Sequence, residues 1–156
     1  MASLSNGIHR WEVPTNSLFS LPFRVADAMK IEIKFTAEPI VVPPLSLPSR
    51  EIGAVVEFHG IVREMEGEMP LDGLFYEAYE SMAENVLEKH LLELAALHGC
   101  TAVIFIHRTG WVPVGEASLY LRVASSHRAE ALRFLADSID RLKLDVPIWK
   151  RTAPKE

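Results

Sequence analysis

Two lysines near the end of the chain have types and spacing that could do chemistry. Lys143 and Lys150 flank an apolar turn that contains Pro147, and Arg151 follows directly. An amine that lies near other cations releases its proton more easily, so it can serve as an acid, a base or a nucleophile. The two lysines are therefore the candidate catalytic residues.

Three further cations could bind an anion. His127 and Arg128 stand where an apolar helical pattern begins, and Arg63 ends a strand-like run. The first turn of a helix presents free backbone N–H groups and the positive end of the helix dipole, which together favour phosphate. An arginine side chain can hold a phosphate or carboxylate at two points. These three residues are predicted to form an anion site with the lysines.

Taken alone, each of these residues also has an ordinary structural interpretation. A lysine after a helix is usually a solvated residue that complements the helix dipole, which is one interpretation of Lys143. His127 could be an exposed first-turn histidine, and Arg128 could pair with Glu130 or Asp137. The residue types by themselves leave both interpretations open.

Composition narrows the class of protein. The chain has 156 residues, 49% of them hydrophobic, which is enough for one domain with a core. Its formal net charge of -5 argues against nucleic-acid binding, because phosphate backbones require a strongly basic surface. No apolar run approaches the ~20 residues that span a bilayer, so we expect no membrane segment and a cytoplasmic location. A secretory signal is not expected either.

The histidines and the single cysteine do not suggest a metal centre or a thiol mechanism. The six histidines lack the close paired spacings of zinc ligands. Cys100 follows Gly99 at the start of an apolar run, where a free cysteine is usually an inert small hydrophobe. We therefore expect no metal and no cofactor.

The hydrophobic periods predict the elements that must position these side chains. Alternation predicts strands, and apolar residues at helical intervals predict helices. Gly60 marks a bulge or a close approach of the backbone. The expected strands are 52–62, 71–79, 101–107 and 117–123, with turns at 66–68 and 110–115. The strand at 117–123 is expected to be half-buried, because its apolar residues alternate strictly with polar ones. A capping box of Ser81 and Glu84 is expected to open one helix that stops at Gly99, and a second helix runs from after Ser126 to before Pro147. This order predicts an α+β domain with a mostly antiparallel sheet covered by two main helices.

The domain is expected to begin near residue 30. Residues 1–29 show no period and are assigned no core role, so they are predicted to be an N-terminal extension to a domain of residues 30–156. Pro43, Pro44 and Pro48 mark an irregular connection, because proline cannot donate to a strand ladder.

Five sequence blocks, in this order, resemble one family over roughly residues 30–152. The blocks are Gly53-Ala54-Val55-Val56 with Gly60-Ile61-Val62-Arg63, Leu74-Phe75-Tyr76-Glu77-Ala78-Tyr79 before Met82-Ala83, His107-Arg108-Thr109-Gly110 before Gly115-Glu116, Ser126-His127-Arg128, and Pro147-Ile148-Trp149-Lys150. Together they are similar to the large, catalytic subunit of molybdopterin synthase.

The resemblance implies a fold, an activity and partners. It implies an α/β-hammerhead type of fold. The implied activity is the transfer of sulfur from the C-terminal thiocarboxylate of a small ubiquitin-like subunit to cyclic pyranopterin monophosphate (precursor Z). This transfer makes the dithiolene of molybdopterin. It also implies a homodimer with one small subunit at each end, a heterotetramer overall. The alternative is a non-catalytic module that binds the ubiquitin-like sulfur carrier, because Thr152 stands where the family commonly has an acid.

The resemblance also assigns roles to the five cations. Lys143 is expected to lie closest to the thiocarboxylate carbonyl, with Lys150 as proton donor or electrostatic partner. Arg63, His127 and Arg128 are expected to bind the phosphate and the pterin, together with the two lysines.

Overall fold

The computed structural model describes residues 29–154, which form an α+β fold of eight strands and two helices. The elements in chain order are β1 (Lys30–Thr36), β2 (Ala54–Ile61), β3 (Met65–Glu66), β4 (Met69–Ala78), α1 (Glu80–His98), β5 (Ala102–Arg108), β6 (Gly110–Pro113), β7 (Ala117–Ser125), α2 (Arg128–Asp145) and β8 (Ile148–Pro154). The extension predicted for residues 1–29 lies, except for Met29, outside the described residues.

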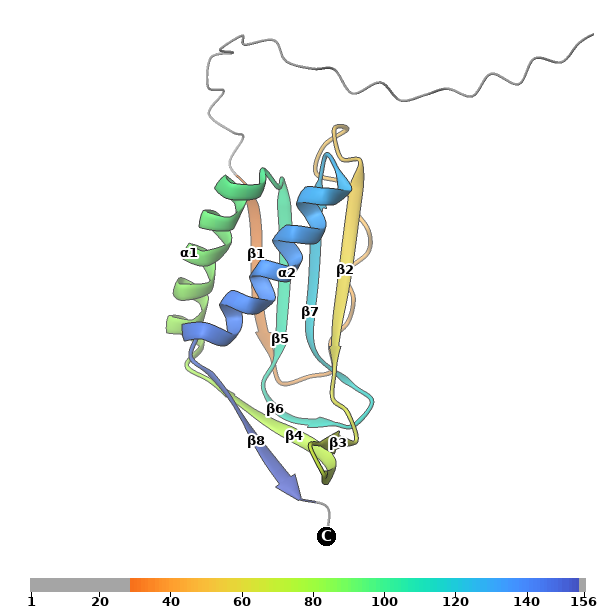
Figure 1. The fold of residues 1–156 in the computed structure, drawn as a ribbon, viewed down its shortest axis with the longest axis vertical. Coiled ribbons are helices and arrows are strands. Elements are labelled where there is room, and N and C mark those ends of the chain that lie inside the picture. The colour runs from red at the N-terminus through yellow and green to blue at the C-terminus, as the bar shows by residue number, and fades with distance from the viewer. Residues whose placement is uncertain (1–28, 155–156) are drawn as a thin grey trace, which may run out of the picture.

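The larger sheet carries both helices on one face. Its strand order is β1-β5-β7-β2, with β1 parallel to β5 and the other neighbours antiparallel. Figure 1 shows α1 and α2 side by side in front of this sheet. Leu87 and Leu91 of α1 and Phe134 of α2 are fully buried in one core with Phe105 and Leu121 of the sheet. The predicted fold, a mostly antiparallel sheet covered by two helices, is confirmed.

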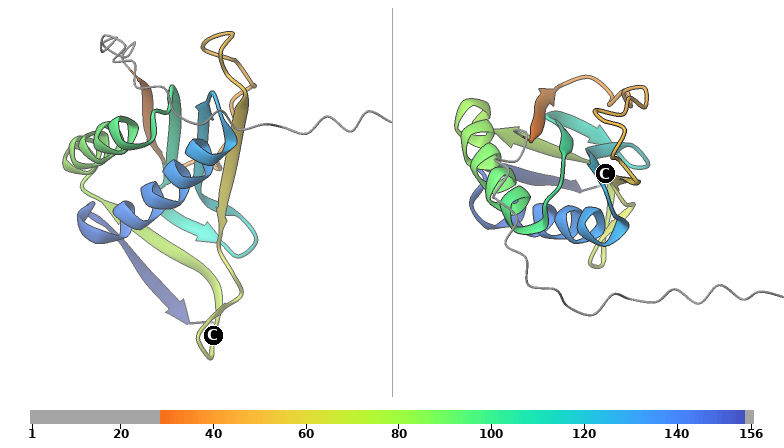
Figure 2. Two further views of the ribbon diagram at one scale, coloured as in Figure 1. Left: turned by 45° about the horizontal axis from the view of Figure 1, so that its top comes forward. Right: turned by 90° about the horizontal axis from the view of Figure 1, so that it is seen from above.

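A second, smaller sheet is built around β4. This strand pairs with β3, β6 and β8, all antiparallel, and lies beyond one end of the larger sheet (Figures 1 and 2). The expected turn at 110–115 is partly wrong, because Gly110–Pro113 form β6. Strand β6 can approach β4 because Gly73 has no side chain: a Cβ there would lie 2.5 Å from the Trp111 ring and from the Val112 carbonyl oxygen. Strand β8 was not predicted.

The face of the larger sheet opposite the helices is covered by the connection between β1 and β2. The sequence predicted β7 as a half-buried strand, yet Tyr120 and Arg122 on its polar face are 0% and 6% exposed. Arg122 donates hydrogen bonds to the carbonyl oxygens of Pro43 (2.6 Å) and Pro44 (3.1 Å), which holds this proline-rich segment against the sheet. The prediction of a half-buried strand is therefore wrong, because the alternating pattern of the strand does not reveal that another segment covers its polar face.

Glu57 completes this anchor. Its Oε1 accepts hydrogen bonds from the Tyr120 hydroxyl (2.9 Å) and from Arg122 Nε (2.7 Å). These two bonds lower the pKa of the Glu57 carboxyl, whereas burial raises the pKa of Tyr120 to about 12. A charged carboxylate and a neutral phenol thus hold the arginine that fixes the loop.

The ends of the helices follow from local signals, with one exception. Gly99 ends α1 in the left-handed conformation (φ 72°) and donates its N–H to the Ala95 carbonyl oxygen at 2.7 Å, as predicted. The predicted capping box is wrong: α1 begins at Glu80 after Tyr79, so Ser81 lies inside the first turn, and no side chain caps it. Helix α2 occupies the predicted range.

Candidate functional site

Arg63 lies at the junction of the two sheets. Strand β2 ends in a register shift between Gly60 and Ile61, which confirms the predicted bulge. The next residue, Val62, is buried; its N–H donates to the Glu116 carbonyl (3.0 Å) and its carbonyl accepts from the Gly115 N–H (2.9 Å). The backbone before Arg63 is therefore fixed, while the Arg63 side chain is exposed.

Lys150 lies at the same end of the molecule. It stands in β8 opposite Tyr76 of β4, and its Nζ forms an ion pair with Glu66 of β3. Glu66 is three residues from Arg63, so their Cα atoms are at most about 11 Å apart. The smaller sheet thus brings Lys150 to the hairpin that begins beside Arg63.

A short turn at Val146 and Pro147, here called the corner, connects the helix that carries Lys143 to the strand that carries Lys150. Lys143 is exposed in the last turn of α2, and Val146 and Pro147 connect that turn to β8. The Tyr79 N–H donates to the Pro147 carbonyl oxygen at 3.1 Å, and Val146 is buried in the main core. The placement of both lysines therefore depends on this corner.

His127 and Arg128 lie at the opposite end of α2. His127 is the N-cap residue with an extended backbone (φ −133°, ψ 152°), and Arg128 is the first residue of the helix. Arg128 and Lys143 are fifteen residues apart in the helix, which at about 1.5 Å per residue separates their Cα atoms by roughly 22 Å. One chain does not bring the five predicted residues into one pocket: His127 and Arg128 form one group at the start of α2, and Lys143 and Lys150, on either side of the corner after α2, form a second.

Most of these cations are free to meet a ligand. Within residues 29–154, the side chains of four candidates make no hydrogen bond or ion pair, and all are exposed. These four are Arg63, His127, Arg128 and Lys143. Only Lys150 is paired, with Glu66. Unpaired basic groups on a chain of net charge -5 are suited to a local anion site.

The thiol of Cys100 and the ring of His107 are in the protein interior. Burial raises the pKa of the Cys100 thiol to about 11 and lowers the pKa of His107. The His107 Nδ1 lies 2.8 Å from the Arg108 carbonyl oxygen. Neither group is available as a nucleophile or base at the surface. In the part of the chain described, no group of three or more His, Cys, Asp or Glu side chains could hold a metal ion.

Sequence reasoning missed the polar contacts that join the two helices. His90 Nε2 lies 2.6 Å from Asp145 Oδ1, and His98 Nε2 lies 2.7 Å from Asp137 Oδ2. A signal was present for one of them, since His90 falls at helical spacing among the buried leucines of α1.

None of the helices described in the structure is long and apolar enough to cross a membrane.

The fold and its exposed cations define an α+β protein with two helices on one sheet and a surface suited to anionic ligands. The sequence model of the MoaE protein family matches residues 35–145, and the chain belongs to this family. Molybdopterin synthase catalytic subunit of Homo sapiens is 38% identical over 135 residues, which cover 85% of this chain and 71% of that protein. The family and enzyme class predicted from the sequence, a sulfurtransferase of molybdenum cofactor biosynthesis, are confirmed.

Solved structures agree with this assignment. The crystal structure of molybdopterin synthase from Staphylococcus aureus matches with a TM-score of 0.71 and 32% identity, over 78% of this chain and 90% of that one. A complex of subunits 1 and 2 of molybdopterin-converting factor from Helicobacter pylori 26695 matches with a TM-score of 0.55 and 25% identity, over 80% and 84% of the chains.

Proposed function

We propose that this chain transfers sulfur from the C-terminal thiocarboxylate of a small ubiquitin-like subunit to cyclic pyranopterin monophosphate, and so builds the dithiolene of molybdopterin. The observation that carries the proposal is the set of exposed cations without partners, Arg63, His127, Arg128 and Lys143, on an acidic chain. Both the thiocarboxylate and the cyclic phosphate are anions, so both are attracted to these groups. The Helicobacter pylori complex supports a second kind of subunit as partner.

The two lysines have different tasks in this proposal. The Lys143 ammonium group lies by the thiocarboxylate carbonyl oxygen and stabilises the negative charge that develops there as water adds and the C–S bond breaks. Before this hydrolysis the thiocarboxylate sulfur attacks a side-chain carbon of the pterin, and an oxygen substituent of that carbon leaves and takes up a proton. Hydrolysis of the resulting thioester then leaves the sulfur on the pterin as a thiolate and releases the small subunit as a carboxylate. Lys150, oriented by Glu66, donates a proton or stabilises charge on the pterin.

A second copy of the chain completes the site. A single pterin phosphate cannot bridge roughly 22 Å between Arg128 and Lys143 of one helix. In a homodimer, His127 and Arg128 of one copy meet Arg63, Lys143 and Lys150 of the other, and two equivalent sites arise by symmetry. One small subunit at each site gives a heterotetramer.

Removal of Lys143 tests the proposal. The purified chain is mixed with thiocarboxylated small subunit and precursor Z, and molybdopterin is followed over time. We expect Lys143→Ala to slow product formation by about 10²-fold or more, because one charge-stabilising group is lost at the reacting carbonyl. Lys89→Ala, which removes an exposed lysine of α1, serves as control and retains the wild-type rate. A wild-type chain that binds the small subunit but forms no product is the non-catalytic module instead.

A further inference from the structure

The last residue of α2 has a charge that its position disfavours. Asp145 ends the helix, where unpaired carbonyl oxygens carry partial negative charge. A carboxylate at this end is less favourable than a neutral group, because it repels those oxygens. The helix therefore does not explain Asp145 by itself, and the explanation lies in a contact with another element.

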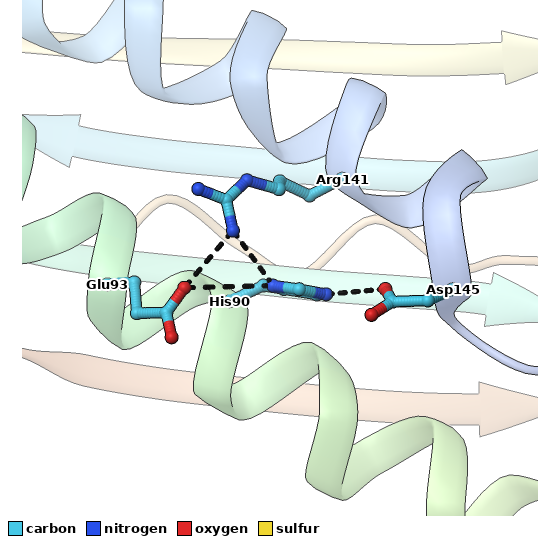
Figure 3. Close-up of polar contacts among 4 residues, drawn as sticks. All are labelled: His90, Glu93, Arg141 and Asp145. Carbon is cyan, nitrogen blue, oxygen red and sulfur yellow. Dashed lines mark hydrogen bonds and ion pairs between the residues drawn. The ribbon is translucent and has the colours of Figure 1, made fainter.

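That contact is His90 of α1. Its Nε2 lies 2.6 Å from Asp145 Oδ1, and Figure 3 shows the imidazole between the two helices. His90 occupies the core-facing side of α1 with Leu87, Leu91 and Leu94, and its side chain is 11% exposed. Helical periodicity calls for an apolar residue there. Asp145 is thus unfavourable at the end of its helix, and His90 is unusual on the core-facing side of its own. The two residues form a hydrogen bond with each other.

Arg141 fixes the orientation of the imidazole. Its Nη1 lies 3.2 Å from His90 Nδ1 and donates to Glu93 Oε2 at 3.1 Å (Figure 3). A guanidinium has no acceptor, so the Nδ1 contact is a hydrogen bond only when Nδ1 is unprotonated. The ring proton is then on Nε2, which faces Asp145. His90 Nδ1 also lies 3.9 Å from Glu93 Oε2, so contacts on both sides of the ring hold the imidazole in one orientation.

The bond between His90 and Asp145 acts on the part of the chain that carries both lysines. Asp145 follows Lys143 by two residues, which places the two side chains about 200° apart around the helix axis. An anchor on the side facing α1 thus sets the rotation of the last turn and the direction of Lys143 on the other side. The same anchor immediately precedes the corner at Val146 and Pro147, which leads to Lys150.

We infer that His90 and Asp145 are positioning residues for sulfur transfer. Their hydrogen bond, with the ring held by Arg141, fixes the last turn of α2 and the corner after it, and through them the placement of Lys143 and Lys150. The inference rests on the proposed function of the two lysines. It adds two residues, fifty-five positions apart in the chain, that act through the placement of the two lysines.

The same two helices contain a matched control. His98 Nε2 lies 2.7 Å from Asp137 Oδ2, and the His98 side chain is 12% exposed. In both pairs a histidine of α1 contacts an aspartate of α2, and the two histidine side chains are similarly buried. Asp137, however, lies six residues before Lys143, away from the corner. A difference between the two pairs therefore reports on closeness to the lysines and not on helix packing.

Steady-state kinetics of the sulfur transfer test the inference. We expect His90→Leu to lower kcat about tenfold with KM within about threefold, because misplaced lysines weaken the reaction more than the binding. His98→Leu keeps both constants within about twofold. His90→Gln, whose amide nitrogen can donate to Asp145, recovers most of the lost kcat. Equal kcat values for His90→Leu and His98→Leu overturn the inference.

A second pair of variants removes the bond from its exposed end. The Asp145 side chain is 60% exposed and the Asp137 side chain 44%, so neither Asp145→Ala nor Asp137→Ala disturbs the core. We expect the loss of kcat in Asp145→Ala alone. An equal loss in both variants assigns the effect to helix packing and overturns the positioning role.

Amide hydrogen exchange separates this inference from the proposed function, because it needs no turnover. In His90→Leu we expect amides in 142–148 to exchange at least about tenfold faster than in the wild type, with those of 83–91 unchanged. His98→Leu leaves 142–148 unchanged. If the wild type makes no product, the proposed function fails, and the exchange still decides whether His90 fixes the corner. Unchanged exchange at 142–148 in His90→Leu overturns the inference even where activity falls.

Discussion

The separation of roughly 22 Å between Arg128 and Lys143 along α2 predicts that two inactive variants restore activity when mixed. Lys143→Ala removes a group from one end of the helix, and Arg128→Ala removes a group from the other. If each site takes Lys143 from one copy and Arg128 from its partner, a mixed dimer contains one site with both substitutions. Its other site has neither and is intact.

The size of the recovery follows from symmetry. Random exchange of equal amounts of two chains gives half of the dimers as mixed dimers, and each has one intact site of two. The expected activity is therefore about one quarter of the wild-type rate at the same total chain concentration. A site contained in one chain predicts no recovery, because each chain then has its own defect.

The assay measures molybdopterin formed from precursor Z and thiocarboxylated small subunit after the two variants are unfolded in urea together and refolded. A mixture of Lys143→Ala with Lys150→Ala is the control, because both residues belong to the same group and every site in the mixed dimer keeps a defect. Recovery in the control equal to that in the test mixture, or none in the test mixture despite verified mixed dimers, refutes the composite site.

Two further predictions concern ionisable groups whose pKa the fold shifts. The pKa of Glu57 is lowered in the fold, so its carboxylate stabilises the fold above the ordinary pKa, and this contribution is lost as the pH falls through and below about 4.5. In urea unfolding, the free energy of unfolding should therefore fall less between pH 6 and pH 3.5 for Glu57→Gln than for the wild type. Parallel plots of this free energy against pH for the two proteins would contradict the anchoring role. The raised pKa of Cys100, about 11 against an ordinary 9.0, leaves about 100-fold less thiolate near neutral pH. Iodoacetamide should therefore label Cys100 about 100-fold more slowly in the folded chain than in urea, and equal rates would show an accessible thiol.

The parts of the fold that were predicted correctly depend on local signals. Gly99 stops α1 because a left-handed residue is needed there, and the alternation of Leu119, Leu121 and Val123 predicts β7 without knowledge of its neighbours. The burial of Arg122 could not be predicted in this way. It depends on a proline-rich segment without periodicity, which reaches Arg122 from almost eighty residues earlier in the chain.

In the candidate site, too, local signals predicted some features, whereas contacts between distant segments could not be predicted. Residue types and short motifs pointed to five cations and predicted one anion site for them. Helix α2, however, holds Arg128 and Lys143 roughly 22 Å apart within one chain. The bond of Asp145 to a residue fifty-five positions earlier depends on how two helices pack, which no local pattern encodes.

The pairing of β8 with β4 also matters for synthesis of the chain. Tyr76 pairs with Lys150 and Leu71 with Pro154, so this ladder joins segments more than seventy residues apart. Ordering so long a loop costs entropy, and β8 is the last of the described strands to leave the ribosome. Until then, β4 has an open edge that can pair with another nascent chain. A polypeptide that stops before Ile148 therefore lacks Lys150 and also exposes an edge that promotes aggregation.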